Sequence, residues 1–204
     1  LISGRGSNMQ ALLEAAQDAT YPAEIALVVS NRADAKGLQR AEDAGIHTAV
    51  LPHTHFPSRD EHDAMLNMVL KEHGIELICL AGFMRILGAE FVAKWEGRIL
   101  NIHPSLLPKF PGLNTHTRAI EAGETEHGAT VHFVTAELDA GPIIAQEAVP
   151  IQPDDTPDAL AARVLEVEHR LYPQALREVA EMGAGEPASE ADVGDLPRRL
   201  TYPA

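Results

Sequence analysis

Residues 75–81 read IELICLA, an almost continuous apolar run. A strand with apolar side chains on both of its sides is typical of a parallel sheet that helices cover on both faces. Ahead of this run, Ser58 and Glu61 have the spacing of a capping box that opens a helix, and Gly74 ends that helix. The sequence therefore predicts a helix over residues 58–73 that leads into a buried strand.

The same alternation continues on both sides of this unit. Strand-like runs cover residues 23–30, 46–51 and 98–102, and a helical pattern that Gly45 ends covers residues 36–44. This order predicts an α/β fold. We expect an open, mostly parallel, twisted sheet of the Rossmann-like type, with helices on both faces.

The pattern changes in the last third of the chain. Two further strands are predicted over residues 128–134 and 142–151. Thr156 then has the place of an N-cap, with a proline at the first helical position. We predict a long helix from there to about residue 182, with Pro173 as a kink or break.

One domain accounts for most of the chain, because 204 residues suffice for a full core. We assign residues 1–182 to this domain. Residues 183–204 are rich in Gly, Pro, Ala and acidic side chains, and we predict a poorly ordered C-terminal tail there. The chain opens on the end of an apolar strand, so we expect the natural protein to begin a few residues earlier.

Composition excludes several classes of protein. With 30 acidic and 16 basic side chains, the net charge of −14 argues against broad nucleic-acid binding, since phosphates require a basic face. No apolar run approaches the ~20 residues that cross a bilayer, and no signal peptide is visible. Cys79 is the single cysteine, which fits a reducing compartment. We therefore expect a cytoplasmic protein without a membrane partner, and a monomer or homodimer. The histidines form no metal-binding motif, and we expect no metal.

Open parallel sheets bind ligands beyond the carboxyl ends of their strands, where residues 3–8, 81–87 and 101–112 are expected. In the first of these segments, Gly6, Ser7 and Asn8 stand between a strand and a helix. Backbone N–H groups at such a helix start can hold a phosphate. A tight structural turn with a capped helix explains the pattern equally well, and both interpretations stay open.

Asn101 and His103 are two residues apart in a strand and therefore point to the same side. An amide donor beside a protonated imidazole suits a reaction that develops negative charge on oxygen. Asp139 lies in a Gly/Pro-rich turn, and a carboxylate near an imidazole stabilises its charged form. The alternatives are a satisfied polar pair at a strand end and a solvated turn residue.

Four motifs together resemble the phosphoribosylglycinamide formyltransferase family: residues 2–8, 81–87, 101–108 and 132–142. The resemblance covers residues 1 to about 178. It implies that the chain transfers the formyl group of 10-formyltetrahydrofolate to the amine of glycinamide ribonucleotide, in purine biosynthesis. Asn114 departs from the pattern, where the resemblance suggests a histidine.

The resemblance also implies roles for individual residues. Asn101 and His103 would stabilise the oxyanion, and Asp139 would orient or charge His103. The residues implied to bind the ribonucleotide are Gly6, Ser7, Asn8, Leu165, Glu166, Val167 and Glu168. Those implied to bind the folate are Arg59, Met84, Arg85, Ile86, Leu87, Asn101, Thr135, Ala136, Glu137, Leu138 and Asp139.

Other functions remain alternatives. A formyltetrahydrofolate hydrolase and a methionyl-tRNA formyltransferase use the same co-substrate. The hydrolase would need an additional N-terminal domain, and the tRNA enzyme a basic one, which the net charge of −14 disfavours. A non-catalytic nucleotide- or folate-binding module would have no use for Asn101, His103 and Asp139 together.

Overall fold

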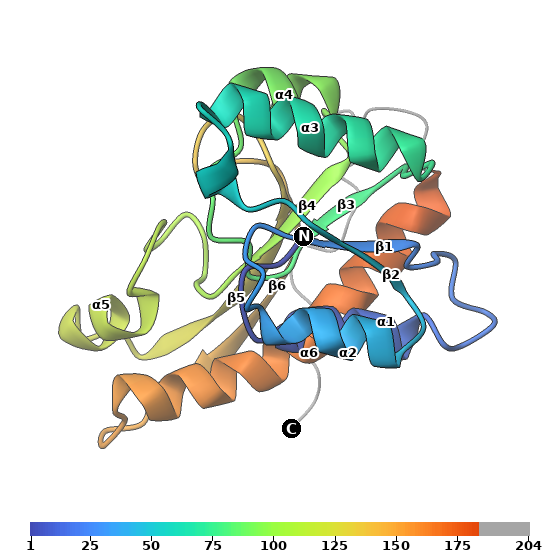
Figure 1. Cartoon of the computed structure of the whole chain (residues 1–204). Helices are drawn as coiled ribbons and strands as arrows, with labels where there is room; N and C mark the ends of the chain where they lie inside the picture. The colour runs from blue at the N-terminus through green and yellow to red at the C-terminus, as the bar shows by residue number, and fades with distance from the viewer. Residues whose placement is uncertain (184–204) are drawn as a thin grey trace.

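The computed structural model describes residues 1–183 (Figure 1). In chain order its elements are α1 (Ser7–Ala15), β1 (Leu27–Ser30), α2 (Lys36–Asp43), β2 (His47–Val50), the short 3-10 helix η1 (His53–His55), α3 (Arg59–Glu72), β3 (Ile78–Leu80), α4 (Ala89–Lys94), β4 (Ile99–His103), α5 (Thr115–Glu121), β5 (Glu126–Phe133), β6 (Ile143–Pro150) and α6 (Pro157–Met182). Strands and helices alternate as far as β4, as the sequence predicts.

The sheet is parallel through its first strands and antiparallel at its far edge. β1 pairs with β2 in parallel, and β3 with β4 in parallel. The N-terminal residues lie between these two pairs, because Ile2 bridges Ser30 while the Leu1 carbonyl accepts from the Ala81 N–H at 2.9 Å. β5 and β6 then add antiparallel to β4. The predicted open, mostly parallel sheet is confirmed.

Helices cover both faces of this sheet, as predicted (Figure 1). One buried cluster, here the α6-side core, joins Val28, Leu100 and Ile102 to apolar residues of α1, α2 and α6. A second cluster, the α3-side core, joins Val29 and Ile99 to residues of α3 and α4. Neighbouring strand residues point to opposite faces, so β1 and β4 each contribute to both cores.

The predicted helix ends are largely confirmed. The Ser58 hydroxyl accepts from the backbone N–H of Glu61 at the start of α3, and the Thr156 hydroxyl accepts from that of Ala159 at the start of α6. Of the predicted kink or break at Pro173, a break does not occur, because α6 continues through that residue to Met182, and the kink stays a prediction. The Pro173 carbonyl instead accepts from the hydroxyl of Tyr21.

Two short helices, α4 and α5, are absent from the sequence interpretation. α4 has Gly88 as its N-cap and α5 has Asn114, and neither forms a side-chain capping bond. Without a cap or several turns of apolar periodicity, such segments give little signal.

The domain division at residue 182 stays a prediction. α6 ends at Met182, and apart from Gly183 the predicted tail lies outside the described residues. Among the described helices, none combines the length and apolar character that a membrane span requires.

Candidate active site

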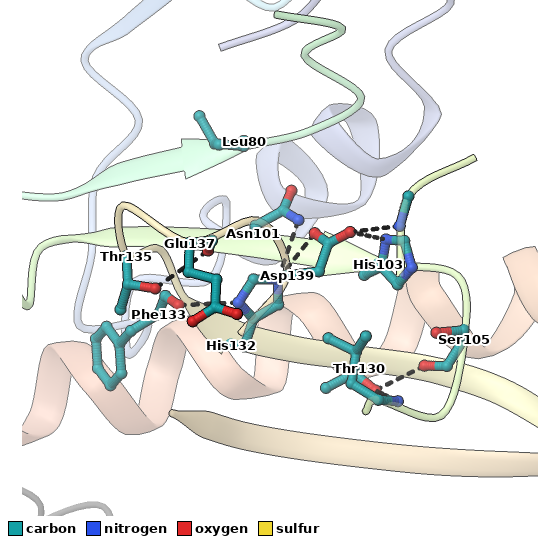
Figure 2. A network of polar contacts seen from close by, with 12 residues as sticks. Leu80, Asn101, His103, Ser105, Thr130, His132, Phe133, Thr135, Glu137 and Asp139 are labelled. Carbon is teal, nitrogen blue, oxygen red and sulfur yellow. Dashed lines mark hydrogen bonds and ion pairs between the residues drawn. The ribbon is translucent and has the colours of Figure 1, made fainter. Parts of the chain in front are cut away.

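The C-terminal half of β4 carries two polar side chains on one side of the sheet. Asn101 and His103 alternate with Leu100 and Ile102, whose side chains belong to the α6-side core. Across the strand pair, Asn101 lies opposite His132 of β5. Figure 2 shows these side chains gathered beside Asp139. The apolar residues of β4 therefore fix the direction in which the polar ones point.

The loop between β5 and β6 brings Asp139 to this place. It closes on itself, since the Phe133 N–H donates to the Pro142 carbonyl at 2.9 Å. A Cβ at Gly141 would overlap the Phe133 carbonyl, so only glycine fits there. Asp139 itself has a positive φ of 52°, which is uncommon for a residue with a side chain. The tight loop thus turns the carboxylate back over β4.

His103 contacts an acceptor at each ring nitrogen. Its Nδ1 lies 3.5 Å from Asp139 Oδ2, and its Nε2 lies 3.0 Å from the carbonyl oxygen of Phe110. Asp139 Oδ2 also accepts from the Gly112 N–H at 2.8 Å. An imidazole donates from both nitrogens only when it is doubly protonated. Each ring nitrogen of this buried imidazole therefore faces an oxygen that can accept from it.

His132 is a member of the cluster that the sequence analysis does not single out. Its Nδ1 lies 2.8 Å from the Phe133 carbonyl, and its Nε2 lies 3.2 Å from Asn101 Nδ2 and 3.8 Å from Asp139 Oδ1. Burial lowers the pKa of His132, and the carbonyl of Phe133 and the charge of Asp139 offset this lowering only in part. A neutral ring that donates through Nδ1 leaves Nε2 to accept from the amide of Asn101. His132 thereby fixes which end of that amide faces the ring.

The arrangement suits a reaction through a tetrahedral oxyanion. One amide N–H of Asn101 points to His132, which leaves the second N–H as a free donor. The 3.5 Å contact of His103 Nδ1 with Asp139 is longer than a charge-assisted hydrogen bond, so the Nδ1–H can be shared with a second acceptor. Two convergent donors beside a carboxylate are what an oxyanion site requires.

The glycine-rich turn at residues 4–6 leads into α1. Gly6 has a φ of 71°, and a Cβ there would lie 2.9 Å from the Cα of Gly37, at the start of α2. The structural interpretation of this turn is therefore correct as far as Gly6 is concerned. Ser7 begins α1, and its backbone N–H is among those that an α-helix leaves without a partner. Phosphate binding there stays a prediction.

Asn8 and Glu168, far apart in sequence, form a buried pair. Asn8 Nδ2 donates to Glu168 Oε2 at 2.6 Å, and Asn8 Oδ1 is buried without a partner among the described residues. Burial raises the pKa of Glu168, and the bond from Asn8 offsets this only partly. The pair presents oxygen acceptors, which suit a ligand that carries hydroxyl or amine donors.

A cavity of about 430 Å³ opens beside Ser7, between α1, α2 and α6. Arg40, His169 and Arg170 contribute cationic or titratable groups to its wall. His169 Nε2 is buried without a partner in the described part of the chain. Glu14 also lines the cavity and tempers its positive charge.

The residues implied to bind folate lie around the catalytic cluster. The loop after β3 is held by Ser3, whose hydroxyl accepts from the Met84 N–H at 2.8 Å. Met84 and Ile86 are exposed, whereas Leu87 is buried in the α3-side core. Arg59 approaches the same loop, since its Nε lies 3.8 Å from where a Cβ on Gly88 would stand.

The remaining predicted residues divide between surface and core. Thr135, Ala136, Glu137 and Leu138 form the exposed part of the loop that ends in Asp139. On α6, Glu166 is exposed and Leu165 is half-buried. Val167 packs in the α6-side core, so its side chain serves packing there. Within residues 1–183, no group of three or more His, Cys, Asp and Glu side chains is placed to hold a metal ion.

Comparison with known proteins decides the family. A family model described as formyl transferase matches residues 1–176. The chain belongs to the formyl transferase family. The phosphoribosylglycinamide formyltransferase of Escherichia coli is 50% identical over 173 residues, which are 85% of this chain and 82% of that protein. The resemblance inferred from the motifs is confirmed.

Solved structures of formyl transferases share the fold. The phosphoribosylglycinamide formyltransferase from Brucella melitensis matches with a TM-score of 0.85 at 55% identity, covering 88% of this chain and 92% of that one. The trifunctional purine biosynthetic protein adenosine-3 of Gallus gallus is 56% identical over 180 residues. These are 88% of this chain and 18% of that protein. The chain thus spans less than a fifth of the length of this trifunctional relative.

Proposed function

We propose that the chain transfers the formyl group of 10-formyltetrahydrofolate to the amine of glycinamide ribonucleotide, a step of purine biosynthesis. The observation that carries the proposal is the cluster of Asn101, His103 and Asp139 at the end of β4, within a formyl transferase fold. Relatives at about half identity over most of the chain carry the name of this activity. The formyl-carrying folate is a co-substrate in this proposal, and no metal takes part.

The proposed mechanism begins with attack of the substrate amine on the formyl carbon. A tetrahedral intermediate then carries its negative charge on the former carbonyl oxygen. The second amide N–H of Asn101 and the Nδ1–H of His103 donate to this oxyanion. Asp139 orients His103 and holds a water through which a proton passes from the attacking nitrogen to N10 of the folate. The intermediate collapses by breaking the bond between the formyl carbon and N10.

The two substrates occupy opposite sides of the cluster in this proposal. The phosphate binds the N–H groups of Gly6, Ser7 and Asn8, at the positive end of the α1 dipole. The adjacent cavity supports this position, because Arg40, His169 and Arg170 line it. Glu168 accepts from the ribose hydroxyls, with Leu165, Glu166 and Val167 along the same edge. The folate lies against Arg59, the loop of Met84, Arg85, Ile86 and Leu87, and the loop of Thr135, Ala136, Glu137 and Leu138.

The chain acts in the cytoplasm, as a monomer or a homodimer, in this proposal. Cys79 is half-buried, and burial raises the pKa of its thiol to about 11, which disfavours the thiolate that a nucleophile needs.

A turnover assay distinguishes the proposed acceptor from its alternatives. The purified chain is given 10-formyltetrahydrofolate together with glycinamide ribonucleotide, with water alone, or with formyl-acceptor tRNA. We expect formyl transfer to the ribonucleotide only. Release of formate in water alone would indicate a hydrolase, and formylation of the tRNA would indicate the other transferase. Ligand binding with no turnover in any arm would indicate a binding module.

A further inference from the structure

One turn of the chain holds both members of the His103–Asp139 pair. The carbonyl of Phe110 lies 3.0 Å from His103 Nε2, and the N–H of Gly112 donates to Asp139 Oδ2 at 2.8 Å. We call residues 110–113 the bridging turn. Because the turn supplies an acceptor to the imidazole and a donor to the carboxylate, its shape sets how these two groups face each other.

The backbone conformation of the bridging turn needs stabilising contacts from outside the turn. Phe110 has a φ of 55° and Asn114, directly after the turn, a φ of 57°. Left-handed conformations of residues with side chains are unfavourable and persist where surrounding contacts enforce them. Some contact outside the turn must therefore stabilise this shape.

Arg118 of α5 supplies that contact. Its Nη1 donates to the Pro111 carbonyl at 2.6 Å and to the Leu113 carbonyl at 3.2 Å. Its guanidinium also lies over the Phe110 ring, 5.4 Å from the ring centre. One side chain thus contacts three of the four residues of the turn. The Phe110 ring also has His127 as a neighbour, at 6.1 Å between ring centres in an edge-on arrangement.

We propose that Arg118 is a positioning residue for formyl transfer, which holds the bridging turn so that Phe110 and Gly112 present His103 and Asp139 to each other. The inference rests on the proposed function for its effect on rate, but the contacts stand without it. The described contacts of the Arg118 side chain are with Phe110, Pro111 and Leu113, and include neither His103 nor Asp139. It acts through the backbone of the turn, by the two hydrogen bonds of its Nη1 and by the planar guanidinium over the Phe110 ring rather than by its charge alone.

The test compares Arg118→Gln and Arg118→Lys with wild type in the full chain. We expect kcat to fall about tenfold in Arg118→Gln, below the ~10² that a 1 Å misplacement costs, with both KM values within about twofold. Lysine keeps the charge but has no planar guanidinium to lie over the Phe110 ring, so Arg118→Lys should recover only part of the rate. Full recovery by lysine, or an unchanged kcat in Arg118→Gln, would overturn the proposal.

Arg98 provides a matched control. Its guanidinium lies 4.7 Å from the centre of the Trp95 ring and donates to the Lys94 carbonyl at 2.7 Å, the same two kinds of contact away from the site. Arg98→Gln should leave kcat unchanged. An equal loss of kcat in both variants would show general destabilisation and would overturn the positioning role.

Two further measurements separate this inference from the proposed function. Amide exchange at Gly112, followed by NMR, needs no turnover, and Arg118→Gln should speed it about tenfold, because the N–H bond to Asp139 opens more often. Unchanged amide exchange at Gly112 would overturn the role of Arg118 in holding the bridging turn, even if the enzyme is active.

In an Asp139→Asn background, Arg118→Gln should have little additional effect on kcat, since both changes act through the His103–Asp139 pair. If the losses of kcat in the two single variants multiplied in the double variant, this would contradict action of Arg118 through the His103–Asp139 pair.

Discussion

The catalytic cluster and the Asn8–Glu168 pair are both buried and polar, yet their hydrogen bonds differ. In the cluster of Asn101, His103, His132 and Asp139, each side chain contacts more than one protein group, or contacts a neighbouring side chain that does. Asn8 and Glu168 share one bond, and Asn8 Oδ1 has no partner among the described residues.

This difference separates preorganisation from binding. Donors that stabilise a transition state gain most when the protein fixes them before reaction. A buried acceptor without a donor is unfavourable until a ligand supplies one. The cluster is therefore expected to govern kcat, and the Asn8–Glu168 pair to govern the KM of the ribonucleotide. Four variants test this division, in order of expected effect.

The largest effect is expected for Asn101→Ala, which removes one donor to the oxyanion. We predict a fall in kcat of about 10²–10³, with little change in either KM. Steady-state kinetics with each substrate varied in turn gives both constants. A KM effect without a kcat effect would move Asn101 from the catalytic group to the binding group.

Asp139→Asn is expected to lower kcat by roughly 10². The amide oxygen can still accept from the Gly112 N–H, which preserves the turn, but the negative charge beside His103 Nδ1 is lost. Binding of a folate analogue, measured by calorimetry, should persist. If turnover stays normal, Asp139 is only a turn residue, and catalysis rests on Asn101 and His103.

Glu168→Gln should raise the KM of the ribonucleotide about tenfold with kcat nearly unchanged, since a hydrogen bond to a charged acceptor is worth about 1.5–3 kcal/mol. Glu181→Gln, at an exposed position near the end of the same helix α6, is the matched control and should change neither constant. A selective fall in kcat would show that the Asn8–Glu168 pair belongs to the catalytic group.

The same variant has a predicted effect on stability with a definite sign. Burial raises the pKa of Glu168 above its unfolded value, so its contribution to stability is fully present below about pH 4.3 and is lost as the pH rises. Glu168→Gln should therefore gain stability over wild type at neutral pH and not at pH 4. Urea unfolding at the two pH values measures this difference. An equal difference in stability between Glu168→Gln and wild type at both pH values would contradict a raised pKa of Glu168.

The smallest effect is expected at His132, which orients Asn101 without contacting substrate. His132→Phe removes the acceptor for the Asn101 amide and should lower kcat about fivefold, within the cost of one neutral hydrogen bond. His132→Gln keeps an acceptor at similar reach and should lose less. A drop near that of Asn101→Ala would place His132 among the reacting groups.

Local signals predicted the fold well. Ser58 and Gly74 bounded α3, and the apolar run at residues 75–81 predicted a sheet covered on both faces. The helices α4 and α5 were missed because they are short and lack capping side chains. Pro173 does not end α6, because buried residues on both sides of it hold the helix against the core.

The site was predictable to the extent that it is local. Asn101 and His103 follow from their spacing in one strand. Asp139 depends on a loop that folds back over β4, and only the family resemblance indicated it. His132 and Arg118 depend on the register of β5 and on the place of α5. The sequence pattern within one segment shows neither the register of β5 nor the place of α5.

The alternation of side chains along β4 has a consequence for how this protein can change over evolution. Ile99 lies in the α3-side core and Leu100 and Ile102 in the α6-side core, while Asn101 and His103 each follow one of the α6-side residues. A single inserted or deleted residue ahead of Asn101 would exchange the two sides of the strand and bury both polar groups against α6. We expect descendants of this chain to vary in the length of the surrounding loops, while single-residue insertions and deletions in β4 are eliminated by selection.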